Sequence, residues 1–333
     1  MTVFWTFAYN AEKTIARAIE SIISQRCGDF IYYVLDNGST DSTGQIIHDY
    51  AAKDSRIIPL HEQVNIMGAT GKYLDRLLET GENGYFALLD ADDEYTDDFL
   101  EKTLDFANSN NLDAVACGTQ WVSDNGIRND VPEDTLVMEG SGFIEYLPKY
   151  YRYTNRMWSI LFSRKLLRRM QFATPDSIKN KGGSFRDAMY AFRGFTLAKR
   201  AGLMAEIMHK YYVRTDSVSL QYSPDWFKYV NEAQNQLSKF IESYGAANRE
   251  LSNFLHIQYL TRLKYILPRI MGAEVPAEVK LRDLTEIVSS KQTCELMDLD
   301  WKAVGIYSDK EDFISEIYGW IEQLKMMSRG CIA

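Results

Sequence analysis

The feature that most constrains this chain is a short apolar run that ends abruptly in carboxylates. Residues 84–89 read as a buried β-strand, and Asp90, Asp92 and Asp93 follow it at once. Because a buried strand cannot carry unpaired anions, these side chains should lie just past its C-terminal end, where open α/β sheets bind ligands. Asp90 and Asp92 would point to one side of an extended chain. This pattern predicts a platform for Mg²⁺ or Mn²⁺ and a diphosphate, and leaves open a solvated acidic turn before the helix from Thr96.

Strands and helices alternate ahead of this acidic run. The hydrophobic spacing predicts strand, helix, strand, helix and strand in turn, over residues 2–8, 12–25, 30–35, 43–50 and 56–60. Such alternation favours a mostly parallel sheet with right-handed crossovers. No G-x-G-x-x-G follows the first strand, and Ile66 stands where a P-loop ending at Lys72 needs its first glycine. A dinucleotide-binding Rossmann domain and a P-loop are therefore both disfavoured.

Size, charge and cysteine usage narrow the class of protein further. A chain of 333 residues exceeds the usual single domain, so one large domain and a smaller one are expected. The formal charge of −9 argues against a general nucleic-acid binder, which needs a basic footprint. No C-x-x-C pair and no apolar run of about twenty residues occur, which disfavours zinc, a disulfide framework and a membrane-spanning helix. The N-terminus lacks the basic segment of a signal peptide, and a reducing cytoplasm is the expected compartment.

Four motifs occur in a fixed order along the first ninety or so residues. They are Tyr9-Asn10-Ala11-Glu12, Asp36-Asn37-Gly38-Ser39-Thr40-Asp41, the segment 65–72, and Asp90-Ala91-Asp92-Asp93. Together they resemble the inverting family 2 glycosyltransferases of the GT-A fold, over roughly residues 2–219. The resemblance implies an α/β fold, a Rossmann-like mixed sheet flanked by helices, as the catalytic domain over residues 1–220. The pattern beyond it is helical and predicts a separate C-terminal domain over residues 221–333.

The resemblance assigns the nucleotide to residues spread along this domain. Those expected to bind the nucleotide are Tyr9, Asp36, Asn37, Lys72, Asp90 and Arg214. Tyr9 would stack on the base, and an oxygen acceptor after the second strand would read a uracil N–H. Asn37 replaces the aspartate common in this turn. Lys72 replaces the usual arginine, and a solvated lysine is its alternative reading.

The resemblance also assigns a metal and a catalytic base. Asp92 would be the principal ligand of Mn²⁺ or Mg²⁺, with Asp90 near the donor sugar or as a second ligand. His209 is either a third ligand or a structural histidine. Asp187 matches the position of the catalytic base, after a polar, glycine-containing loop at 174–184 that would order over bound donor. Its alternative is an aspartate at a helix N-terminus.

The activity that the resemblance implies is metal-dependent, inverting sugar transfer. The donor would be a nucleotide-sugar, most simply a UDP-sugar, and the acceptor a hydroxyl of a saccharide or lipid-linked saccharide in surface polysaccharide or glycan assembly. Exposed aromatic residues within 150–158 could form an acceptor platform, or simply pack in the core. Peripheral contact with the inner face of the membrane and a homodimer stay open. The competing classes are a sugar-1-phosphate nucleotidyltransferase and a non-catalytic nucleotide- or sugar-binding module.

Overall fold

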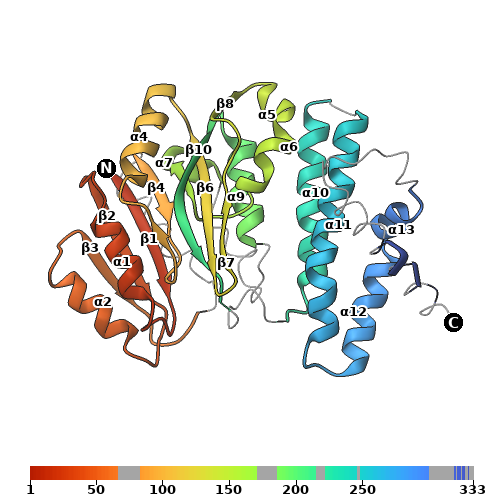
Figure 1. The fold of residues 1–333 in the computed structure, drawn as a ribbon, viewed down its shortest axis with the longest axis horizontal. Coiled ribbons are helices and arrows are strands. Elements are labelled where there is room, and N and C mark those ends of the chain that lie inside the picture. Colours follow the sequence, from red (N-terminus) through yellow and green to blue (C-terminus); the bar gives the residue numbers. More distant parts are fainter. Residues whose placement is uncertain are drawn as a thin grey trace. The chain divides into compact units, whose positions relative to one another are not determined.

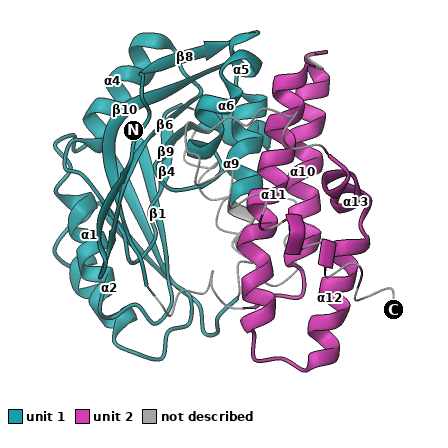
Figure 2. Ribbon diagram, turned by 45° about the vertical axis from the view of Figure 1, so that its right-hand side comes forward, with its two compact units in different colours: residues 1–182, 186–215 teal, residues 183–185, 216–333 magenta. Residues whose placement is uncertain are grey.

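The chain folds into two compact units, which Figures 1 and 2 show in a computed structural model. The structure describes residues 1–66, 83–170, 186–214, 222–245 and 248–299, with short pieces between 319 and 329; for Arg186 and Asp187 it describes the backbone alone. Unit 1 comprises residues 1–182 and 186–215, and unit 2 comprises residues 183–185 and 216–333. The division of roles predicted for residues 1–220 and 221–333 stays a prediction.

Unit 1 is built on a mixed sheet whose described strands run in the order β3-β2-β1-β4-β9-β6-β10-β5, with β7 beside β6 and β8 beside β10. The strands are β1 (Thr2–Ala8), β2 (Phe30–Asp36), β3 (Ile57–His61), β4 (Tyr85–Leu88), β5 (Glu94–Tyr95), β6 (Ala114–Ser123), β7 (Gly126–Asp130), β8 (Leu136–Glu139), β9 (Ile160–Ser163) and β10 (Arg200–Tyr212). Strands β1 to β4 pair in parallel, as do β6 and β10, whereas β9 is antiparallel to both β4 and β6. The predicted mixed sheet is confirmed, with the antiparallel β9 between two parallel parts.

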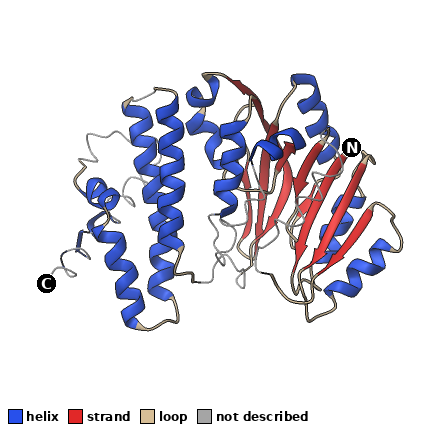
Figure 3. Ribbon diagram, turned by 180° about the vertical axis from the view of Figure 1, so that it is seen from behind, coloured by secondary structure: helices blue, strands red, loops and turns tan. Residues whose placement is uncertain are grey.

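Helices cover both faces of this sheet (Figure 3). Those of unit 1 are α1 (Ile15–Ile23), α2 (Thr43–Ala51), α4 (Phe99–Asn110), α5 (Gly142–Glu145), α6 (Leu147–Tyr150), the 3-10 turn η1 (Tyr151–Tyr153), α7 (Arg164–Met170) and α9 (Arg186–Leu197). The apolar residues of α1, α2 and α4 share one core with Phe4, Tyr32 and Val34 of the sheet. On the opposite face, Phe195 of α9 packs against Phe162 of β9, with ring centroids 6.4 Å apart. Helix α1 is shorter than the predicted 12–25 because residues 11–14 form a turn.

The carboxyl ends of β1, β2 and β4 meet at one edge of the sheet. Ala8 pairs with Asp36 across β1 and β2, and Trp5 pairs with Leu88 across β1 and β4. The acidic run therefore leaves the sheet beside the turns that follow the first two strands, which is where a ligand crevice forms in open α/β sheets.

Unit 2 is helical, with α10 (Trp226–Ser243), α11 (Arg249–Gly272), α12 (Ala277–Ser289) and α13 (Lys291–Met297). Its core gathers apolar residues from all four, including Trp226, Leu263 and Leu296. Arg262 is buried among them and donates to the side-chain oxygen of Gln234 at 2.7 Å, so this core also holds a polar contact. Within the described part of the chain, no helix is long and apolar enough to cross a membrane.

Candidate active site

The turns that follow β1 and β2 are joined by hydrogen bonds between their motif residues. The backbone N–H of Asn10 donates to Ser39 Oγ at 3.0 Å, and Asn10 Oδ1 accepts from the backbone N–H of Thr40 at 2.9 Å. Asn10 has φ of 48°, a left-handed conformation that asparagine tolerates better than most residues. The backbone N–H of Ala11 donates to Thr43 Oγ1 at 2.7 Å. The first two motifs thus form one platform rather than two independent loops.

Asp36 and Asn37 lie at the base of this platform and are both buried. Asp36 accepts a hydrogen bond from the backbone N–H of Ser39 at 3.0 Å, and its second oxygen lies 3.0 Å from His61 Nδ1. The Asn37 side chain donates to Asn65 Oδ1 at 3.0 Å and accepts from the backbone N–H of Ile66 at 3.1 Å. Asn37 therefore connects the second motif to the start of the third.

Tyr9 has the opposite character. It follows β1 directly and its side chain is 47% exposed, whereas the aromatic residues within β1 are buried or partly buried. An exposed ring at the carboxyl edge of a parallel sheet is available for stacking on a planar ligand.

The acidic segment forms a tight turn, held where it leaves β4. The backbone N–H of Asp93 donates to the carbonyl of Asp90 at 3.2 Å, so Asp90 and Asp92 do not lie on an extended chain as the sequence suggested. The carbonyl of Leu88 accepts from the Tyr95 hydroxyl at 2.7 Å, and the carbonyl of Leu89 accepts from Thr6 Oγ1 at 2.8 Å. Buried side chains therefore fix the entry to the turn.

Within the turn, the side chain of Asp92 faces Arg214, which lies two residues after the end of β10. Arg214 Nη1 lies 3.6 Å from Asp92 Oδ2, and both side chains are about a third exposed. An ion pair this exposed to solvent contributes little to stability, so its importance is positional. It places a guanidinium next to the carboxylate at the edge where β1, β2 and β4 end.

Arg17 of α1 holds the same turn from the other side. Its guanidinium donates to the carbonyl of Asp92, lies 3.1 Å from Glu94 Oε1, and sits over the Tyr212 ring with Cζ 3.7 Å from the centroid. The Tyr212 hydroxyl also donates to Glu94 Oε1 at 2.7 Å. Burial and this bond to Glu94 raise the pKa of Tyr212 to about 12. We call Arg17, Glu94 and Tyr212 the Arg17 clamp.

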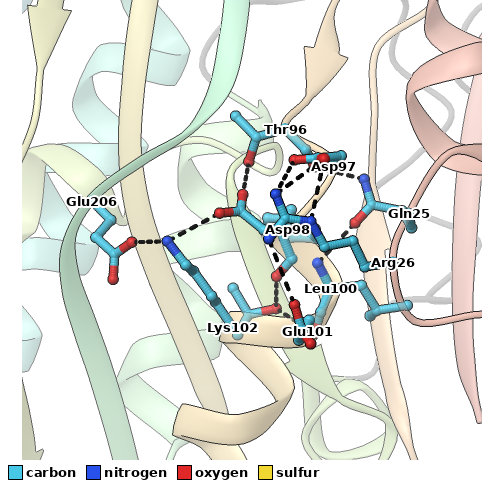
Figure 4. A network of polar contacts seen from close by, with 11 residues as sticks. Gln25, Arg26, Thr96, Asp97, Asp98, Leu100, Glu101, Lys102 and Glu206 are labelled. Atoms are coloured by element: carbon cyan, nitrogen blue, oxygen red, sulfur yellow. Dashed lines mark hydrogen bonds and ion pairs between the residues drawn. The ribbon is translucent and has the colours of Figure 1, made fainter.

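A second network anchors the chain after the turn (Figure 4). Gln25, near the end of α1, donates to the carbonyl of Thr96 at 2.7 Å and accepts from the backbone N–H of Leu100 at 2.9 Å. Lys102 in α4 lies 3.0 Å from Asp98 Oδ2 and also pairs with Glu206 of β10. Helix α1, through Arg17, and Gln25 just after it thus fix the chain on both sides of the acidic turn.

Asp93, the last carboxylate of the turn, points into the protein. Its side chain is fully buried, Oδ1 accepts from the backbone N–H of Tyr212 at 2.9 Å, and Oδ2 lies 3.4 Å from Nε2 of the equally buried His209. Burial, and secondarily the charge of Asp92, raise the pKa of Asp93 well above its usual range. Burial and the charge of Arg156 lower the pKa of His209. The expectation that all three aspartates face a crevice is wrong for Asp93, because its hydrogen bond to β10 turns it inward.

Replacing Asp93 with asparagine should leave a stability difference that changes with pH. The raised pKa means that folding becomes less favourable as pH rises above about 3.8, because Asp93 ionises in the unfolded chain while the folded protein keeps it protonated. Asparagine keeps the acceptor for Tyr212 without this cost. The melting temperature of Asp93→Asn relative to wild type should therefore increase between pH 5 and pH 8, measured in chelator. Asp98→Asn is the matched control of opposite sign, since its bond from Thr96 lowers the pKa of Asp98. A flat difference for Asp93→Asn would contradict the assignment.

The donor set at this edge suits a cation that a substrate completes. Asp90 and Asp92 contribute two carboxylates, and no group of three potential ligands occurs among the residues that the structure describes. Mg²⁺ and Mn²⁺ at diphosphate sites commonly take one or two carboxylates and fill their remaining positions with phosphate oxygens and water. The residues present therefore fit a cation shared with a diphosphate. His209 faces Asp93 and stacks on Trp158 at 4.5 Å, which favours its structural reading.

Three predicted features fall wholly or partly outside the described residues. Lys72 and the loop 174–184 lie outside them altogether. Asp187 is the second residue of α9, and its side chain is not described. That position suits both a base at a helix start and a simple helix-terminal aspartate, so the roles of Lys72 and Asp187 stay predictions.

Two residues of the Arg17 clamp were missed by sequence reasoning. Arg17 lies on a helix whose other side carries the buried isoleucines, so its pattern is that of an ordinary solvated position. Tyr212 is the second tyrosine of the segment before Arg214, and only its position there gave any signal.

Comparison with known proteins identifies the family. The model of glycosyl transferase family 2 matches residues 6–177, which is just over half of the chain. The chain belongs to glycosyl transferase family 2. Relatives of this family 2 glycosyltransferase include the uncharacterized glycosyltransferase EpsJ of Bacillus subtilis, 25% identical over 72% of this chain and 69% of that protein. Another is the poly(ribitol-phosphate) beta-glucosyltransferase of Bacillus spizizenii, 21% identical over 65% of this chain and 33% of that protein.

Solved structures agree with the fold of this family 2 glycosyltransferase. Staphylococcus aureus TarS, residues 1–349 with UDP, has a TM-score of 0.66 at 16% identity and covers 98% of this chain and 90% of its own. The mannosyltransferase PcManGT of Pyrobaculum calidifontis, with GDP-Man and Mn²⁺, has a TM-score of 0.52 at 15% identity, over 88% and 82% of the two chains. The predicted GT-A fold is confirmed, including a mixed sheet flanked by helices and a helical C-terminal region.

Proposed function

We propose that this family 2 glycosyltransferase moves a sugar from a UDP-sugar to an acceptor hydroxyl, with inversion and with the help of Mn²⁺ or Mg²⁺. The observation that carries the proposal is the position of Asp92. It is about a third exposed at the carboxyl edge of the sheet, its backbone is held by Arg17, and Arg214 lies 3.6 Å from its carboxylate. A carboxylate and a guanidinium side by side suit a metal-bound diphosphate, which presents oxygen ligands and negative charge together.

The choice of donor rests on the platform after β1 and β2 and on the neighbours. Tyr9 offers an exposed ring for the base, with Asp36 and Asn37 beneath the same platform. TarS has been solved with UDP and with UDP-GlcNAc, and PcManGT with GDP-Man and Mn²⁺. The TarS complexes favour uracil over guanine for this chain. In this assignment Lys72 and Arg214 contact the diphosphate, and Asp90 lies near the donor ribose or sugar.

The transfer step would use residues from two sides of the donor. Asp92, with Asp90, would hold the cation, which when bound neutralises charge on the leaving diphosphate. Arg214 would add a guanidinium to the same oxygens. The acceptor oxygen forms a bond to the anomeric carbon, the bond from that carbon to the diphosphate oxygen breaks, and Asp187 takes the acceptor's proton. A carboxylate of ordinary pKa suffices because the hydroxyl acidifies as it attacks, so positioning of Asp187 matters more than its basicity.

The biological setting that we propose is assembly of a surface polysaccharide. Relatives carry names such as teichuronic acid biosynthesis glycosyltransferase and poly(ribitol-phosphate) beta-glucosyltransferase. The acceptor would then be a saccharide or a lipid-linked saccharide. The helical domain over residues 221–333 would contribute to binding outside the donor site, by contact with a membrane surface or with a second copy.

The test is a screen of nucleotide-sugars by thermal stabilisation and by metal-dependent hydrolysis. UDP with Mn²⁺ should raise the melting temperature, since a ligand that binds only the folded state stabilises it by mass action; at one hundred times Kd the gain is about 2.7 kcal/mol. A chelator should remove most of this gain, and GDP should give less. Equal stabilisation by UDP with and without the cation would contradict the role of Asp92.

A further inference from the structure

A second group of side chains lies beside the acidic turn and is not used by the proposed donor site. Strands β7, β6 and β10 continue past the rest of the sheet, and Trp121 of β6 pairs with Arg128 of β7 on one side and Tyr211 of β10 on the other. Directly paired residues of neighbouring strands project from the same face. The guanidinium carbon of Arg128 lies 5.2 Å from the Trp121 ring, and the Trp121 and Tyr211 ring centroids are 4.5 Å apart.

Trp158 completes this group from the segment before β9. Its ring lies 5.8 Å from that of Trp121 and 5.3 Å from that of Tyr211. Ser159, which follows it, is fully buried with φ of 63°, a strained conformation for serine. Three hydrogen bonds hold Ser159 there, from its backbone N–H to the Tyr95 hydroxyl at 3.2 Å, from its hydroxyl to the carbonyl of Cys117 at 2.7 Å, and to its carbonyl from the Cys117 N–H at 3.0 Å. Strain that a structure holds this firmly is a feature of functional sites.

Arginines outnumber carboxylates around these rings. Arg156 is 7% exposed, its guanidinium carbon lies 4.4 Å from the Trp158 ring, and it lies 3.4 Å from Asp130. Arg152 also pairs with Asp130, which leaves one carboxylate between two arginines. Arg128 is exposed and forms no ion pair within the described part of the chain. The protein as a whole has a net charge of −9, so this local excess of positive charge is opposite in sign to the overall charge.

Buried polar atoms in this group also lack partners. Among the residues that the structure describes, no hydrogen bond reaches Trp121 Nε1, or Nε and Nη2 of Arg156, or Oγ1 of Thr119. Thr119 lies two residues before Trp121 on β6 and so projects from the same face. Buried donors left unpaired cost free energy, so a cluster of them points to a ligand or to ordered water.

We propose that Trp121, Trp158, Tyr211, Arg128 and Arg156 form the acceptor subsite, and that the acceptor is a saccharide carrying an anionic group. Aromatic rings bind the C–H faces of sugars, and guanidinium groups bind carboxylate or phosphate through paired hydrogen bonds. The subsite is next to the reaction centre, because Tyr211 lies three residues before Arg214 and Tyr212 bonds to Asp93. The proposal rests on the proposed function, which supplies the donor.

Affinity gel electrophoresis in three polymers tests the subsite. The full chain, with UDP and Mg²⁺ present, is run through gels containing polygalacturonate, phosphorylated dextran or neutral dextran. Retardation by either anionic polymer and not by neutral dextran is the expected result, and the arm that responds distinguishes carboxylate from phosphate. Because a protein of net charge −9 is repelled by polyanions, such retardation needs a local binding site.

Variants then locate the binding. Arg128→Gln should raise the apparent dissociation constant about tenfold, the loss expected for one charge-assisted hydrogen bond. Arg26→Gln is the matched control, since Arg26 is similarly exposed in the same unit but pairs with Asp97, between β5 and α4, and contacts none of the proposed subsite residues. Trp158→Leu should also weaken retardation. Each variant is first shown to have the melting temperature of the wild type without ligand, which verifies that it is folded.

The outcomes separate this proposal from the proposed function. Equal retardation by dextran and the anionic polymers would overturn the anionic class, and no retardation, or equal retardation of Arg128→Gln and Arg26→Gln, would overturn the subsite. Stabilisation by UDP and Mn²⁺ with none of this retardation would leave the donor site intact. Retardation lost with Arg128→Gln, in a protein that UDP does not stabilise, would instead support the subsite and contradict the proposed donor.

Discussion

Asp187→Asn should lower the rate of sugar transfer by about 10² to 10⁴-fold while UDP binds as in the wild type. Asparagine keeps the shape of the side chain but cannot accept the acceptor's proton, and Asp187 has no proposed contact with the nucleotide. The measurement pairs turnover of the donor found in the nucleotide-sugar screen with a calorimetric titration of UDP in Mn²⁺. The two readouts must diverge, with turnover falling and the dissociation constant unchanged.

A matched carboxylate gives the control for this comparison. Asp105 lies in α4 of the same unit and is exposed, so Asp105→Asn makes the same change of charge on another helix. It should leave both turnover and binding near wild type. Full transfer by Asp187→Asn with a verified acceptor would mean that Asp187 only stabilises the start of α9, and the base would have to be another residue.

Asp92→Asn should weaken UDP binding and sugar transfer together. Removing a carboxylate ligand should reduce affinity for UDP in Mn²⁺ by about 10²-fold or more, since even residues that only support metal ligands commonly account for 10 to 100-fold. Arg214 then loses its anionic neighbour at 3.6 Å as well. Titration of UDP with Mn²⁺ and then with chelator measures the effect directly.

The chelator arm decides between a metal role and a general electrostatic role. If Asp92 acts through the cation, wild type in chelator and Asp92→Asn in Mn²⁺ should bind UDP with similarly low affinity. Tighter binding of UDP by Asp92→Asn than by wild type would show that the carboxylate merely repels the diphosphate. Asp105→Asn again serves as the control for a lost negative charge.

The sequence predicted the fold well wherever hydrophobic spacing was regular. Strand β1 begins and ends at the predicted residues, and β2 extends only one residue beyond its predicted end. The antiparallel insertion of β9 between β4 and β6 was not predictable from spacing. It depends on pairing between segments more than seventy residues apart, and periodicity reports nothing about partners.

The sequence predicted which motifs meet at this edge of the sheet, but not the side-chain contacts that hold them there. The ordered motifs placed Tyr9, Asp36 and Asp92 at one edge, which follows from the parallel arrangement of the strands that carry them. The inward turn of Asp93 was not foreseen, because it depends on a backbone N–H of Tyr212 nearly 120 residues later. Long-range bonds from single side chains, such as those of Arg17, leave no periodic signal in a sequence.

The Arg17 clamp has a consequence for recombining this enzyme with its relatives. A chimera that takes α1 from one parent and the segment from β4 onward from another would separate Arg17 from Glu94 and Tyr212, although each parental segment folds with its own pattern intact. A mismatched residue at position 17 would leave the turn of Asp92 without its anchor. Crossovers within residues 24–84 should therefore succeed only between parents that share all three members of the clamp, whereas crossovers beyond Arg214 leave it whole.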